Sequence, residues 1–441
     1  MSQNTNDSSK HKNMWLILIA TCLFTFMSTL DGSIVNIAMP TMSKSLSIGM
    51  NEAEWIVSVY MITICCLLIF WGRISDTVGK VKIFKIGTLI FILGSLFCGI
   101  SSTLEMLLIS RIIQATGASM TMATNYGIIT ENFPPEMRGR SLGVLGSFVS
   151  LGSIAGPGIG GIIIQRYTWH YIFLINIPIG IFAFILGYFV FPKSQKRDIP
   201  LKLDYLGFIL FDICIISLFM GIFIGQVIGF NKLSIIMLFL MALCSFIGFI
   251  FQEKRSNNPL IDLTIFNNKS FSVGLTCAVL IFSSNLFMNT LLPFYLQDTL
   301  KLSSLLSGFI LMCVPIAMVV VAPISGALSD KMGAEGLTFT GLLIVSISQL
   351  LFIFIGLKTT MAYLIFLTLL AGIGVALFQS PNNSIIMSSV EHNYLGIAGS
   401  INSLARNIGM VTGLSLSTTI LYSSMTQKAG YKVTNYIEGR D

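Results

Sequence analysis

Four charged side chains lie inside long apolar stretches of this 441-residue chain, where they are the residues best able to do chemistry. Asp31 and Asp212 are the acids, and Arg111 and Arg406 are the bases. A charge at the centre of a bilayer costs about 2.5–3.5 kcal/mol on insertion scales, so an embedded charge is a functional candidate by default. These residue types point to proton or ion chemistry inside a membrane.

Asp31 and Arg111 are predicted at nearly equal depth. Asp31 stands about eight residues, roughly 12 Å, from the outer end of its apolar run, and Arg111 about six residues, roughly 9 Å, from the outer end of another. Burial favours the neutral carboxyl group and a nearby arginine favours the charged one, so a contact that forms and breaks would load and unload a proton. A fixed structural pair, or a polar pocket capped by Asp31, is the alternative. Gln114 lies one turn inward from Arg111, on the same helix face.

The other embedded polar residues have a second explanation. Asp212 is expected to make a structural polar contact, with a functional role as the alternative. Arg406 is expected to satisfy carbonyl groups or a neighbouring helix, with a direct transport role in the cavity as the alternative. Uncharged polar side chains also occur within apolar runs, where either interhelical hydrogen bonds or a cavity lining would account for them; they are Asn125, Asn285, Asn289, Gln379 and Asn382.

A short motif occurs twice, as Gly72–Gly79 (GRISDTVG) and Gly326–Gly333 (GALSDKMG). Each copy lies in a polar gap between apolar runs, which predicts a tight turn whose aspartate, Asp76 in the first copy, accepts hydrogen bonds or caps the next helix. This duplication indicates two related helix bundles, the plan of many secondary transporters. Because the basic tail Lys80 and Lys82 follows only the first copy, the second is expected to be little more than a turn. A plain turn is also the alternative for the first copy.

Small residues recur every fourth position in a further apolar run, at Gly152, Gly156 and Gly160, with Pro157 and Gly161 beside them. This spacing allows two helices to approach closely, and the proline removes a backbone hydrogen bond. Close packing alone would explain much of the pattern.

Composition places the chain in a membrane. It is 54% hydrophobic and only 10% charged, whereas a soluble domain averages about 25% charged residues. The cysteines lack metal-ligand spacing, the histidines lie at the ends of apolar runs, and no nucleophile–base cluster or phosphate-binding loop occurs. We therefore predict no enzyme, no cofactor, no metal site and no nucleic-acid partner.

Thirteen windows have the length and apolarity of a membrane-spanning helix, so the chain is predicted to be an all-α polytopic membrane protein. A retained first helix, not a cleaved signal peptide, is expected at the N-terminus. The windows lie near residues 15–39, 52–71, 83–103, 105–128, 141–164, 171–191, 204–228, 233–251, 271–293, 304–325, 337–357, 361–385 and 397–422.

The charges in the connecting loops predict orientation and domains. Alternate loops starting with the N-terminus hold sixteen lysines and arginines, and the opposite loops hold five. The positive-inside rule therefore places the N-terminus and both motifs in the cytosol. The motif positions divide the chain into an N-terminal six-helix bundle (1–192), a linker with an inserted helix pair (193–262) and a C-terminal bundle lacking its last helix (263–441). Residues 423–441 are polar and are predicted to form an external tail that does not span the membrane.

Several segments together resemble one family. They are LDGSIVNIAMP at 30–40, RIIQATG at 111–117, GSIAGPGIGG at 152–161 and WHYIFLINIPIG at 169–180. They are similar to the fourteen-helix drug:proton antiporters of the major facilitator superfamily, the EmrB/QacA-like branch. The resemblance implies a major facilitator fold with fourteen helices, of which thirteen are visible here, and an inserted pair that lies outside the main cavity.

The resemblance also implies roles for residues. It implies that Asp31 takes part in proton coupling and substrate binding, and that Arg73 and Asp76 belong to a latch that holds the two bundles together in one state. It also implies a hinge or leak-preventing role for the segment 152–161. The expected function is proton-driven export of amphipathic cationic or zwitterionic drugs or dyes across the cytoplasmic membrane, by a monomer in the lipid bilayer. An exporter of a native metabolite or lipid, and a non-transporting receptor or assembly protein on the same scaffold, are the alternatives.

Overall fold

The computed structural model describes residues 2–192 and 203–429, and every regular element within them is a helix. The first half contains α1 (Ser2–Ser45), α2 (Met50–Ala53), α3 (Trp55–Val78), α4 (Lys80–Gly99), α5 (Leu104–Asn132), α6 (Pro135–Arg166), α7 (Tyr171–Leu174) and α8 (Asn176–Val190).

A hairpin of two helices follows, and then the second half. These elements are α9 (Tyr205–Ile228), α10 (Leu233–Arg255), η1 (Leu263–Asn267), α11 (Lys269–Phe294), η2 (Tyr295–Thr299), α12 (Ser304–Met332), α13 (Ala334–Leu351), η3 (Phe352–Phe354), α14 (Met361–Ser388), η4 (His392–Tyr394) and α15 (Leu395–Ala429).

The predicted all-α polytopic architecture is confirmed, with thirteen long helices in the described part of the chain. Eleven of them are long and apolar enough to cross a membrane. The two that fall short, α5 and α15, carry many polar side chains into the interior of the protein. Their polarity is therefore hidden from lipid by the helices around them.

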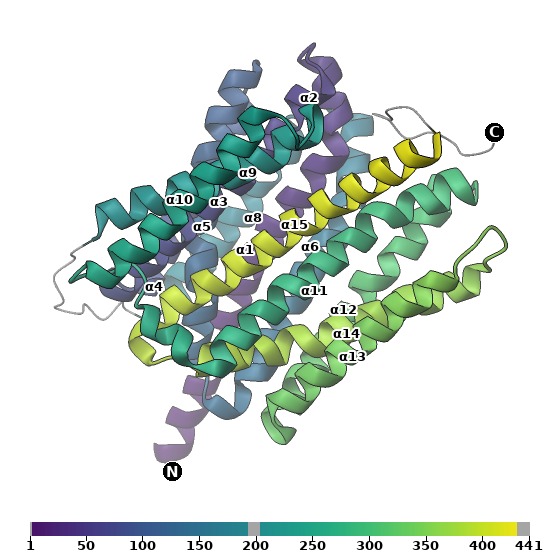
Figure 1. Ribbon diagram of the computed structural model, residues 1–441. Coiled ribbons are helices and arrows are strands. Elements are labelled where there is room, and N and C mark those ends of the chain that lie inside the picture. Colours follow the sequence, from purple (N-terminus) through teal and green to yellow (C-terminus); the bar gives the residue numbers. More distant parts are fainter. Residues whose placement is uncertain (1, 193–202, 430–441) are drawn as a thin grey trace.

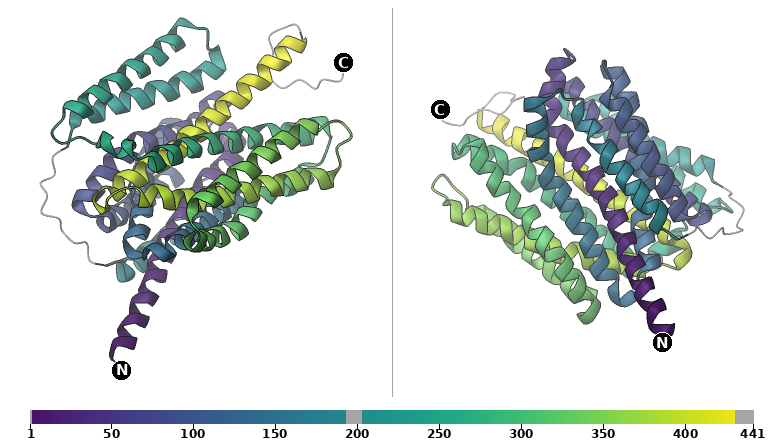
Figure 2. Two further views of the ribbon diagram at one scale, coloured as in Figure 1. Left: turned by 60° about the horizontal axis from the view of Figure 1, so that its bottom comes forward. Right: turned by 180° about the vertical axis from the view of Figure 1, so that it is seen from behind.

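The helices form two groups that meet along a seam (Figure 1). In the first group α1 packs on α6 and α8, and α5 packs on α3 and α4; in the second, α14 packs on α12 and α13, and α11 packs on α15. The seam is made chiefly by α6 against α12 and by α15 against α3 and α5. The α9–α10 hairpin lies to one side, which Figure 2 (left) shows, and contacts α3 and α15 through α9.

Two glycines end helices at one end of the molecule, here called the motif end. Gly79 (φ 107°) ends α3 and Gly333 (φ 91°) ends α12, a backbone conformation that other residues rarely adopt. The turns are shorter than predicted, because the rest of each motif is helical and forms the last turns of α3 and α12. Each predicted polar gap is thus a single glycine between two consecutive helices.

The C-terminal segment also differs from expectation. The predicted span 397–422 belongs to a longer helix, α15, which continues to Ala429, so the first residues of the predicted polar tail are helical. Within the described residues, the second group contains five long helices, α11 to α15. The rest of the predicted tail and the basic linker 193–202 lie outside the described residues.

Candidate functional site

Asp31 is the centre of a sealed polar network, and its side chain has no exposure to solvent. Its Oδ2 accepts a hydrogen bond from Arg111 Nη1 at 2.6 Å, and its Oδ1 accepts from Gln114 Nε2 at 2.9 Å and Asn176 Nδ2 at 2.8 Å. Gln114 Nε2 also donates to Ser95 Oγ at 2.9 Å. The network therefore ties together α1, α4, α5 and α8.

Arg111 is buried completely and held from several sides. Its Nε donates to the Ile56 carbonyl at 3.1 Å, its Nη1 also donates to Gln114 Oε1 at 2.6 Å, and the guanidinium lies 4.0 Å from the centre of the Tyr60 ring. Its Nη2 has no hydrogen-bond partner. A buried ion pair is costly to break, about 3–5 kcal/mol when one partner is removed, because the remaining charge is left uncompensated.

The structure thus brings Asp31, Arg111 and Gln114 together, and adds two partners that sequence reasoning missed. Asn176 lies in a segment that carried the family resemblance, so its position was a usable signal, whereas nothing marked Ser95. The predicted depth needs correction, because α1 continues to Ser45 and Asp31 therefore lies near the middle of the apolar span Met14–Ser45.

The first motif joins the two helix groups at the motif end. Asp76 accepts hydrogen bonds from the backbone N–H groups of Gly396 (2.8 Å) and Ile397 (3.0 Å), in the first turn of α15. A carboxylate at a helix N-terminus is stabilised by the free N–H groups and by the helix dipole. Asp76 therefore caps a helix, as predicted for its type, but the helix is α15 of the other group and not α4.

A chain of charges extends from this contact. Lys80 Nζ lies 2.9 Å from Asp76 Oδ1 and 2.7 Å from Glu131 Oε1, and His392 Nδ1 lies 3.7 Å from the same Glu131 oxygen. Gly72 is a packing residue, because a Cβ there would overlap Ser400 of α15. Its predicted part in the turn is therefore wrong, whereas Gly79 does make the turn.

The second motif makes the matching contact. Asp330 accepts from the backbone N–H groups of Gly139 (2.7 Å) and Arg140 (2.8 Å) in α6, and Ser380 Oγ donates to the Gly139 carbonyl at 2.8 Å. A Cβ on Gly326 would overlap that carbonyl. The expectation that this copy is little more than a turn is wrong, because its contact with the second turn of α6 needs the carboxylate and the small glycine and not the basic tail.

Arg73 lies near the loop that follows α10 and leads to α11. Asp262, in the loop after α10, accepts hydrogen bonds from the Thr264 side chain and backbone, and these hold the pKa of Asp262 below its usual range. The Tyr394 hydroxyl, which donates to Asp262, and the positive charge of Arg73 lower this pKa further. The first motif thus faces Asp262, in the loop after α10, as well as α15.

The glycine run of α6 packs against α1. A Cβ on Gly152 would meet Phe26 and Thr29, one on Gly156 would meet Ser33, and one on Gly160 would meet Ile34. Pro157 is exposed, and a Cβ on Gly161 would meet nothing. Three members of the set therefore form the close helix contact, while Pro157 and Gly161 lie outside it.

The remaining candidates are scattered. Asp212 on α9 lies near the Cys66 thiol of α3, keeps Oδ1 without a partner, and is not part of the Asp31 network. Among the amides, Asn125 donates to Thr25 (2.9 Å), Asn289 to Asn285 (2.9 Å) and Asn382 to the Gly274 carbonyl (3.1 Å), while Gln379 Oε1 has no partner.

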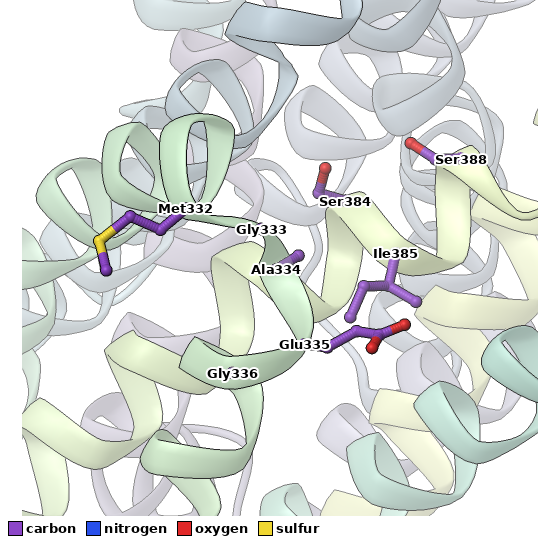
Figure 3. Close-up of a pocket in the computed structure, with 8 residues that line it drawn as sticks. All are labelled: Met332, Gly333, Ala334, Glu335, Gly336, Ser384, Ile385 and Ser388. Carbon is purple, nitrogen blue, oxygen red and sulfur yellow. The ribbon is translucent and has the colours of Figure 1, made fainter.

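A hollow of about 500 Å³ opens at the motif end between α13 and α14 (Figure 3). It contains none of the predicted site residues. Glu335 points across it toward Ile385, and no basic side chain lines it. In the described part of the chain, no three His, Cys, Asp or Glu side chains gather as a metal site would require. The lining residues are Met332, Gly333, Ala334, Glu335, Gly336, Ser384, Ile385 and Ser388.

Two helix groups joined by paired aspartate caps, with a buried charge pair in the first group, match a known family. The model of the Major Facilitator Superfamily matches residues 21–414. The chain belongs to the major facilitator superfamily. Members are multi-pass membrane transporters and not enzymes, and they need no cofactor.

Relatives in this superfamily include multidrug exporters of the expected branch. The chain is 28% identical to multidrug resistance protein 3 of Bacillus subtilis, covering 96% of this chain and 82% of the relative. It is 26% identical to the multidrug export protein EmrB of Haemophilus influenzae (92% and 80%). It is 35% identical to the riboflavin transporter RibZ of Clostridioides difficile (96% and 91%).

A solved structure confirms the major facilitator fold. The proton:xylose symporter XylE superposes with a TM-score of 0.66 at 13% identity, covering 96% of this chain and 92% of that one. At this identity the likeness concerns the fold alone.

Proposed function

We propose that this major facilitator protein is a proton-coupled antiporter that exports amphipathic small molecules across the cytoplasmic membrane. The observation that carries the proposal is the Asp31 network, in which a carboxylate without solvent exposure is held by Arg111, Gln114 and Asn176. An embedded carboxylate paired with an arginine is a group whose protonation changes the local charge and therefore the stability of the pair.

Protonation of Asp31 would leave the Arg111 charge without its counter-ion in a dry site. The cost of that state favours a rearrangement of α1 against α5, and we propose that this step is coupled to alternating access. The proton gradient supplies the energy, with each charge that crosses 100 mV contributing about 2.3 kcal/mol. Asp31 and Arg111 act as the coupling pair, and Gln114 and Asn176 orient the carboxylate.

We propose that the two capped contacts form the gate. Asp76 and Asp330 each bind backbone N–H groups of the opposite helix group, so both must release when the motif end opens. The N-terminus and the motif end face the cytosol in this proposal, as the loop charges predict. The close α1–α6 contact serves as the surface on which the helices of the first bundle pivot, and the monomer with the 1–192, 193–262 and 263–441 division is the transport unit.

Two substrate classes are proposed. Cationic or zwitterionic drugs are supported by the multidrug relatives. A heteroaromatic metabolite such as riboflavin is the second candidate, because of the 35% identical riboflavin transporter and because Asp31 has no exposed surface for a cationic substrate in this conformation.

Everted membrane vesicles test the function directly. Energised vesicles that contain the protein should release protons on addition of a transported compound, across a panel of monocationic, zwitterionic and neutral dyes and riboflavin. The Asp31→Asn variant should bind the compound but lose coupled proton movement. Efflux that remains proton-driven in Asp31→Asn would refute the assignment of the coupling site, and no proton movement with any compound would refute the proposed function.

A further inference from the structure

Arg406, in the first third of α15, has a buried Nε without a hydrogen-bond partner, and no carboxylate among the described residues forms an ion pair with it. Its Nε is buried, yet the side chain as a whole is partly exposed, while residues 401–405 are all buried. A guanidinium group offers five N–H donors in a fixed plane. Arg111, by contrast, meets a carboxylate, an amide and a carbonyl.

The contacts of α15 show where Arg406 points. Gly399, two turns earlier on the same face, lies against Tyr126 of α5, and Asn402, one turn earlier, donates to Asn383 of α14 at 2.9 Å. Gly409, three residues later, lies against Val279 of α11. Residues three, four and seven apart share one helix face. Arg406 therefore lies on the face of α15 that packs against α5 of the first group and against α11 and α14 of the second, beside the seam between the two groups.

The same region leaves other polar atoms without partners. Ser403 Oγ on α15, and Gln379 Oε1 and Asn382 Oδ1 on α14, are buried and have no hydrogen bond. Buried polar groups in native proteins are nearly always paired, and an unpaired set calls for an explanation such as a ligand or ordered water. Together with the buried Nε of Arg406, these atoms leave hydrogen-bonding capacity on α14 and α15 unused, and the guanidinium is the charged group among them.

We propose that Arg406 binds an oxyanion or strongly accepting carbonyl oxygen of the transported molecule, as in the carboxylate end of a zwitterion. This inference rests on the proposed export function, and it specifies which end of the substrate the second bundle recognises. A guanidinium matches a carboxylate in a bidentate, charge-assisted geometry. A molecule with only cationic groups is disfavoured at this position.

Binding of two dyes with the same ring system tests the proposal without a proton gradient. Fluorescein carries negative charge at pH 7.5, and rhodamine 123 carries positive charge on the same xanthene scaffold. Titrated by fluorescence anisotropy against the purified full-length protein in lipid nanodiscs, fluorescein should bind more tightly than rhodamine 123. Arg406→Gln should weaken fluorescein binding by about 10- to 100-fold, the range for a hydrogen bond to a charged group, and leave rhodamine 123 unchanged or tighter.

Two further variants sharpen the result. Arg406→Lys, which keeps the charge but loses the planar fork, should fall between the wild type and Arg406→Gln. Arg166→Gln removes an equal charge from an exposed position, the last residue of α6. This variant should bind both dyes as the wild type does. Equal fluorescein binding by the wild type and Arg406→Gln, or an equal loss in Arg166→Gln, would overturn the proposal.

The wild-type protein provides a test that does not depend on folding of a variant. Fluorescein should protect Arg406 from modification by phenylglyoxal, measured by peptide mass spectrometry, and rhodamine 123 should not. Arg406 modified at the same rate with and without fluorescein would overturn the proposal. A different result would refute the proposed export function, namely the absence of proton movement in the vesicle experiment with every compound tested.

Discussion

Replacing Asp76 by asparagine should open the motif end by a measurable amount. The carboxylate binds the N–H groups of Gly396 and Ile397 through one oxygen each. An asparagine retains one acceptor oxygen and turns an NH₂ group toward the other N–H, so one charge-assisted bond is lost and the other becomes neutral. A hydrogen bond to a charged group contributes about 1.5–3 kcal/mol and a neutral one about 1 kcal/mol. The expected loss is therefore about 2–5 kcal/mol.

Hydrogen–deuterium exchange measured by mass spectrometry reports this loss of free energy as faster exchange of the amide groups that Asp76 binds. At 1.36 kcal/mol for each tenfold change, the amide protection of the peptide that contains Gly396 and Ile397 should fall by roughly 30- to 5,000-fold. Lys80 keeps Glu131 as a partner at 2.7 Å, so no buried charge is orphaned by the substitution. If both caps close one gate, protection at Gly139 and Arg140 should fall as well, because the two contacts open together.

The second cap provides the matched comparison. Asp330→Asn should lower protection first at Gly139 and Arg140 and then at Gly396 and Ile397, while Glu335→Gln, at an exposed site of the same end, should change neither. Unchanged exchange at Gly396 and Ile397 in Asp76→Asn would refute the capping argument. Loss confined to one cap in each variant would refute the single gate.

Three other changes have defined outcomes. Gly156→Val should lower the thermal midpoint of the purified protein, because even a Cβ at this position overlaps Ser33, whereas Gly161→Val should not, because a Cβ there meets nothing. Asn176→Ala should remove a hydrogen bond to a charged group, about 1.5–3 kcal/mol, and lower both the thermal midpoint and coupled proton movement; an unchanged midpoint would show that Asp31 does not need this donor. Because the pKa of Asp262 is lowered in the folded protein, its contribution to stability is present above the unfolded pKa and is lost as the pH falls through the folded pKa. Asp262→Asn should therefore be less stable than the wild type at pH 7, and the difference should shrink below about pH 4, the ordinary range of an aspartate; a difference that stays constant with pH would contradict this.

The sequence by itself determined the helices and the residues that could hold charge in the membrane. A membrane-spanning helix is defined by a continuous stretch of apolar residues, which is visible in the sequence. The free-energy cost of an embedded charge depends on how far it lies from the ends of that stretch. For this reason the thirteen predicted windows correspond to the thirteen long helices that the structure describes. Asp31, Arg111 and Gln114 could be singled out from the sequence for the same reason. The glycine spacing at 152, 156 and 160 predicted a close helix contact, although not its partner, α1.

Only the tertiary structure decided what these residues touch. Asn176 reaches Asp31 across 145 positions, and Asp76 reaches Gly396 across 320. Such contacts depend on the tilt and rotation of whole helices, which hydrophobicity leaves open because any apolar face is equally satisfied by lipid. The role of the second motif could not be predicted for the same reason. Its aspartate binds backbone N–H groups of α6, and every residue except proline has such a group, so the sequence does not show which ones are bound.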